Sequence, residues 1–107
     1  MIWVKNNKIN MYEGDTGEFP VFLSGDIQEG DILQFRIKEN LDDETTLYYH
    51  NYNASEQVNI VIDSGTSALL TNDTASDKTL YYGFKLKRSD DTDTILGVGE
   101  FILRKGV

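Results

Sequence analysis

The sequence predicts an all-β fold, an antiparallel sandwich of about seven or eight strands formed by a single domain over residues 1–107. Three observations predict it. Apolar and polar residues alternate with a period of two along several segments, as in strands with one buried face. Turn-forming residues separate these segments every eight to twelve positions, which is typical of a β-sandwich or a barrel. The β-forming residue types Val, Ile, Thr, Tyr, Phe and Trp supply 36 of 107 residues, whereas Ala occurs only three times.

Three segments carry the clearest alternation, and their apolar positions form three inward-facing sets of similar volume. The residues expected in the core are Leu33, Phe35, Ile37, Ile60, Ile62, Tyr82, Phe84 and Leu86. Weaker alternation predicts further strands at residues 9–12, 17–23, 67–70 and 99–104. Pro20 falls inside one of these and removes a backbone donor, so we expect that strand at a sheet edge.

The last two segments are expected to form a hairpin. Residues 80–87 should pair antiparallel with residues 94–104, and the polar stretch 87–94 should form the turn. Gly97 or Gly99 should lie at a β-bulge, since glycine suits the altered backbone of a bulge.

Two stretches do not follow the sheet pattern. In residues 41–56, Leu41, Thr45, Tyr48, Tyr49 and Tyr52 recur at helical spacing, yet paired threonines and tyrosines are mediocre helix formers. A short helix, a long β-hairpin and an ordered loop all fit this stretch. Residues 71–78 are polar and predict a turn or a single helical turn.

Composition excludes several classes of function. The formal charge of −8 disfavours nucleic acid and anionic membrane surfaces as partners. No apolar run reaches the length of a membrane span, and residues 1–11 lack the apolar segment of a signal peptide. Without cysteine there are no disulfides, thiolate metal sites or cysteine nucleophiles.

The residues needed for catalysis are sparse. His50 is the only histidine, and no nucleophile elbow or phosphate-binding loop accompanies it. Asp90, Asp91 and Asp93 cluster carboxylates but do not follow the calcium-loop pattern, so a solvated hairpin turn explains them better. We therefore expect neither an enzyme nor a cofactor or metal site.

The aromatic residues are the most informative side chains. Trp3, Tyr48, Tyr49 and Tyr52 are the residues that we expect at an interaction surface, because amphipathic rings provide contact area at low entropic cost. Packing of these rings over the ends of the sandwich and stacking against a sugar are the alternative interpretations.

The hairpin segment 80–103 is also the most distinctive. It contains Leu80-Tyr81-Tyr82-Gly83-Phe84-Lys85-Leu86, then an Asp-rich turn, Thr94-Ile95-Leu96, and Gly99-Glu100-Phe101-Ile102-Leu103. This segment resembles the terminal hairpin of small immunoglobulin-like β-sandwich domains in phage and prophage proteins, such as the N-terminal domain of phage baseplate upper proteins. Residues 9–16, 30–38 and 69–78 resemble the same family more loosely, whereas residues 41–56 have no counterpart in it.

The resemblance implies an immunoglobulin-like fold and a non-catalytic structural or assembly module. Such a module would bind other phage structural proteins in a baseplate, tail or head fibre, and would also be able to form a homo-oligomer. Its location would be the virion, or the bacterial cytoplasm when expressed from a prophage. The alternative function is a carbohydrate-binding module that recognises a cell-surface glycan through Tyr48, Tyr49 and Tyr52.

Overall fold

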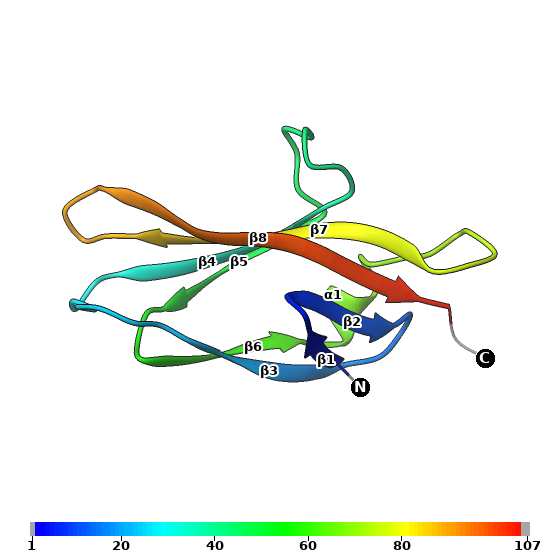
Figure 1. Ribbon diagram of the computed structural model, residues 1–107, viewed down its shortest axis with the longest axis horizontal. Coiled ribbons are helices and arrows are strands. Elements are labelled where there is room, and N and C mark those ends of the chain that lie inside the picture. Colours follow the sequence, from blue (N-terminus) through cyan, green and yellow to red (C-terminus); the bar gives the residue numbers. More distant parts are fainter. Residues whose placement is uncertain (1, 106–107) are drawn as a thin grey trace.

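The computed structural model describes residues 2–105, which form eight strands and one helical turn (Figure 1). The elements are β1 (Ile2–Lys5), β2 (Lys8–Tyr12), β3 (Gly17–Phe22), β4 (Ile32–Lys38), β5 (Tyr48–Asn53), β6 (Gln57–Ile62), α1 (Ser64–Ser67), β7 (Lys78–Lys87) and β8 (Asp93–Arg104). The prediction of an all-β fold with seven or eight strands is confirmed.

The strands form two layers. One sheet has six strands in the order β1-β2-β8-β7-β4-β5, and the other pairs β3 with β6. In Figure 1, β3 and β6 run beneath the six-stranded sheet. All pairings are antiparallel except β2 with β8, which joins the N-terminal hairpin to the last strand. β3, with Pro20, pairs only with β6 among the described strands, so the expected edge position is confirmed.

The core lies between the two layers and follows from the alternation. The buried apolar residues are Ile9, Met11, Phe19, Leu33, Phe35, Ile37, Val58, Ile60, Ile62, Leu70, Leu80, Leu86, Phe101 and Leu103. Six of the eight expected core residues are among them. Tyr82 and Phe84 pack against this core but stay partly exposed. They border a cleft of about 420 Å³, which lies between residues 82–86 and 96–98 of the β7–β8 hairpin and residues 21–27.

The prediction of a strand at residues 67–70 is wrong. Asp63 caps a helical turn instead, and its carboxylate accepts the Thr66 N–H at 2.8 Å. Asp and Ser favour such local side-chain bonds, which outweigh the weak alternation here. Leu70 is nevertheless buried. Residues 71–77 form an irregular loop, in which the buried Asn72 bonds to the main chain of Ser76 and Leu103.

A tight turn between β1 and β2 was not predicted. Asn6 and Asn7 have φ angles of 53° and 62°, and they join the paired residues Lys5 and Lys8. Two successive positive φ angles define a type I′ hairpin turn, and asparagine tolerates them better than most residues.

The β7–β8 hairpin is confirmed, and its bulge lies directly beside Gly97, one of the two glycines expected there. Phe84 pairs with Gly97 and Lys85 with Ile95, so Leu96 is the extra residue, and neither Gly97 nor Gly99 has a positive φ. Gly99 has a different role. A Cβ there would lie 2.6 Å from the Tyr82 hydroxyl, so only glycine lets the Tyr82 ring cross this strand.

Asp31 ties the base of β4 to the hairpin turn. Its buried carboxylate accepts the N–H groups of Gln28 and Ser89, each at 2.9 Å, and pairs with the Arg88 guanidinium at 3.2 Å. The two backbone hydrogen bonds are the main cause that lowers the pKa of Asp31 below its ordinary value of 3.8.

Candidate interaction surfaces

The four aromatic residues expected at an interaction surface do not lie together. Trp3 is in β1 and the three tyrosines are in β5, which are the two opposite edges of the six-stranded sheet. A single contact surface that includes all four residues is therefore not formed within one copy of the chain.

Trp3 is half-buried by its own neighbours. Its ring centroid lies 5.8 Å from that of Tyr12, and the Arg104 guanidinium carbon lies 5.6 Å from the Trp3 ring centroid. Arg104 is held there by Asn10 and Asp77, each at 3.0 Å. The tryptophan thus has an intramolecular cation–π partner, which supports the packing interpretation for this residue.

The three tyrosines alternate between the two faces of β5. Tyr48 and Tyr52 pair with the core residues Ile37 and Leu33, and both rings pack against the core. The Tyr52 hydroxyl accepts the N–H of Val61 at 3.2 Å, and burial of the phenol raises its pKa to about 12. Tyr49 points to the opposite side and is 59% exposed. The three rings therefore do not form a shared stacking platform.

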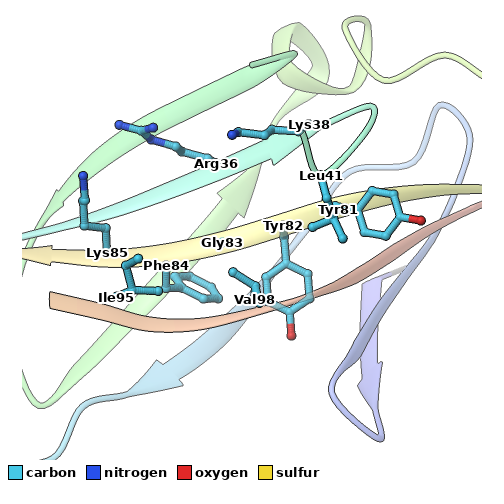
Figure 2. A pocket seen from close by; sticks show the side chains of 10 residues that line it. All are labelled: Arg36, Lys38, Leu41, Tyr81, Tyr82, Gly83, Phe84, Lys85, Ile95 and Val98. Atoms are coloured by element: carbon cyan, nitrogen blue, oxygen red, sulfur yellow. The ribbon is translucent and has the colours of Figure 1, made fainter. Parts of the chain in front are cut away.

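The outer face of the six-stranded sheet, turned away from β3 and β6, carries a hollow that was not predicted. The register aligns Tyr49, Arg36, Gly83 and Val98 in one row across β5, β4, β7 and β8. Because Gly83 has no side chain, this row has a depression at Gly83, between the side chains of Arg36 and Val98. Figure 2 shows the residues around this space of about 220 Å³: Arg36, Lys38, Leu41, Tyr81, Tyr82, Gly83, Phe84, Lys85, Ile95 and Val98.

A second hollow adjoins the first and shares Arg36 with it. It is lined by Gln34, Arg36, Glu44, Thr45, Thr46 and Tyr49. The loop over residues 39–47, which connects β4 to β5, rises from this side of the sheet in Figure 1. We name the continuous surface formed by Arg36, Lys38, Leu41, Tyr49, Lys85, Ile95 and Val98 the outer-face patch.

The outer-face patch is both apolar and basic. Leu41, Ile95 and Val98 are 58%, 73% and 66% exposed, respectively. Within residues 2–105, neither Arg36 nor Lys38 forms an ion pair, and the Arg36 Nε donates to Gln34 Oε1 at 2.7 Å. The Lys85 ammonium pairs with Asp93 at 3.4 Å. Arg36 and Lys38 are thus two cations without an ion-pair partner among residues 2–105, on a face that also carries Glu44 beside the second hollow.

The acidic residues of the hairpin turn form local hydrogen bonds. Asp90 accepts the N–H and hydroxyl of Thr92 at 3.0 and 2.6 Å, and Asp93 pairs with Lys85. Across residues 2–105, the structure places no three His, Cys, Asp or Glu side chains where they could hold a metal ion. None of the helical structure in this range is long and apolar enough to cross a membrane.

Comparison with family models, with curated proteins and with solved structures finds no match to this chain.

Proposed function

We propose that this chain is a non-catalytic structural or assembly module of a phage or prophage, and that it binds other virion proteins in a baseplate, tail or head fibre. The resemblance of the terminal hairpin to immunoglobulin-like domains of phage proteins supports the context. The two-layered β fold supports a rigid scaffold that presents its surfaces to partners.

The outer-face patch is the observation that carries the proposal. Exposed apolar side chains in one continuous area favour association, because each Å² removed from water contributes roughly 25 cal/mol. Tyr and Arg are enriched among the residues that dominate binding energy at protein interfaces, and Tyr49 and Arg36 adjoin each other here. Arg36 has no carboxylate partner among the described residues, so its guanidinium is available to a group on a partner.

The proposal is tested by incorporation into particles. The gene would be deleted from a lysogen of the encoding phage. The lysogen would then express either the wild-type chain or a double variant, Leu41→Ser and Val98→Ser, in its place. The chain would then be quantified in purified virions. We expect the wild-type chain in the particles and at least about a tenfold loss of the double variant, since each lost apolar contact contributes on the order of 1 kcal/mol.

Leu69→Ser is the matched control. Leu69 is 54% exposed, similar to Leu41, but lies just after α1 and outside the outer-face patch. This variant should be incorporated normally. Absence of the wild-type chain from virions would refute the function, and equal incorporation of all variants would refute the role of the patch. Binding of the wild-type chain to a glycan array, without incorporation, would favour the carbohydrate-binding alternative.

A further inference from the structure

We propose that β5 is an open edge at which a second copy of this chain adds its own β5, so that two six-stranded sheets join across a two-fold axis. This contact uses the main chain of β5, whereas the partner binding proposed above uses side chains of the outer-face patch; Tyr49 belongs to both surfaces.

Part of the β5 main chain has N–H and C=O groups without a hydrogen-bond partner among residues 2–105. Ala54 N–H donates to the Asp31 carbonyl at 3.0 Å, which sets the phase of the β4–β5 ladder. Bonded pairs alternate in an antiparallel ladder, so the N–H and C=O groups of Tyr49, Asn51 and Asn53 face away from β4. Within residues 2–105, no other group bonds to the main chain at these three positions.

The other free edges carry features that discourage the addition of a strand. β1 contains Lys5, and β3 contains Glu18 and Pro20. In β6, the N–H of Val61 already donates to the Tyr52 hydroxyl. Charges, proline and occupied backbone groups are the ordinary protections of edge strands. β5 contains no Asp, Glu, Lys, Arg or Pro.

The lack of Asp, Glu, Lys and Arg in β5 favours a second copy of the chain as the occupant. In a two-fold contact each strand faces its own sequence, so any charged residue near the axis would meet a like charge. With Asn51 on the axis, Asn51 would face Asn51, Tyr49 would face Asn53, and His50 would face Tyr52. None of these pairings brings two Asp, Glu, Lys or Arg side chains together, and they place the three outward-facing positions of both strands in hydrogen-bonded register.

The test is the mass in solution of the purified chain, by sedimentation from micromolar to millimolar concentration. We expect the wild type to shift with concentration from 12.2 kDa to twice that mass. Asn51→Pro removes the outward N–H, which an edge strand tolerates, and should abolish the shift. Asn51→Ala is the matched control, because it also loses the Gln34 hydrogen bond to the Asn51 side chain but retains the N–H, and it should dimerise like the wild type.

A second variant tests the same contact in case the proline variant does not fold. Asn51→Asp retains an oxygen for Gln34 but replaces the amide NH2 by a charged oxygen on the two-fold axis, and it should raise the dissociation constant at least about tenfold at low salt. Amide exchange of the wild type should slow at Tyr49, Asn51 and Asn53 as concentration rises. A wild type that stays monomeric at every concentration, or a dimer unaffected by both the proline and aspartate variants, would overturn the proposal without bearing on particle incorporation.

Discussion

Replacement of Gly99 by alanine tests the packing of the hairpin. Gly99 pairs with Tyr82, and an added Cβ would lie 2.6 Å from the Tyr82 hydroxyl oxygen and 2.7 Å from two ring carbons. Cβ atoms in folded proteins essentially never lie within 3.0 Å of a non-bonded atom, so the ring or the strand must move. The ring is held by its hydroxyl, which donates to the Asn7 carbonyl at 2.7 Å, and by the rings of Phe35 and Phe84.

The size of the effect follows from the contacts that the ring would lose. The Asn7 hydrogen bond contributes about 0.5–1.5 kcal/mol, and loosening one aromatic contact removes a similar amount. The free energy of unfolding should therefore fall by about 1–3 kcal/mol, which is also the usual effect of overpacking. For a domain of this size the melting temperature should fall by about 4–20 °C.

Thermal and urea unfolding would measure this change, with Gly97→Ala as the matched control. A Cβ at Gly97 would meet no atom within 4 Å, so that variant should melt at or slightly above the wild-type temperature. In a Tyr82→Ala background, Gly99→Ala should cost little further stability. The reasoning would be refuted if Gly99→Ala were as stable as the wild type, or if its effect persisted undiminished without the tyrosine ring.

Three further predictions concern the turn and two titrating groups. Asn7→Gly should raise the free energy of unfolding in urea by up to about 1 kcal/mol, since its φ of 62° suits glycine; a loss of stability would contradict the turn assignment. Because the pKa of Asp31 is lowered from 3.8, its charge stabilises the fold above that pH and the contribution disappears as pH falls below it. The melting temperature of Asp31→Asn should thus be lower than that of the wild type at neutral pH and should fall less on acidification; parallel curves would rule this out. Because burial raises the pKa of Tyr52 from 10.0 to about 12, stability should be fully present below pH 10 and decline as pH rises towards 12, and Tyr52→Phe should reduce the decline. Tyrosinate absorbance should show one phenol fewer titrating near pH 12 in that variant.

Alternation predicted the strands wherever one face of a strand meets the core and the other meets water. Residues 33–37, 58–62 and 80–86 are of this kind, and each lies in an observed strand. β1 was not predicted, because apolar and polar residues do not alternate along its four positions and because its position depends on the Asn6-Asn7 turn. For β5 the sequence fits a strand, a helix and a loop alike, because tyrosines at positions 48, 49 and 52 satisfy both the helical and the strand period.

The candidate surfaces were less predictable than the strands. All three tyrosines of the run were expected at a surface, but only Tyr49 is strongly exposed, because the strand period turns Tyr48 and Tyr52 towards the core. The outer-face patch gathers residues from four strands and a loop, and only the register between strands brings them together. Arg36, Lys38 and Lys85 were recognisable only as polar positions on the wet faces of their strands.

The single parallel pairing has a consequence for how the chain folds. β2 pairs with β8, so Ile9 lies beside Phe101 and Met11 beside Leu103, about ninety residues apart in the chain. Pairings of such long separation are entropically costly to close and slow the folding of β-rich domains. During synthesis, the N-terminal hairpin must therefore keep these two apolar side chains without their final partners until the last strand has been made. Folding of the six-stranded sheet should accordingly be completed late, with the joining of β2 to β8 as its closing step.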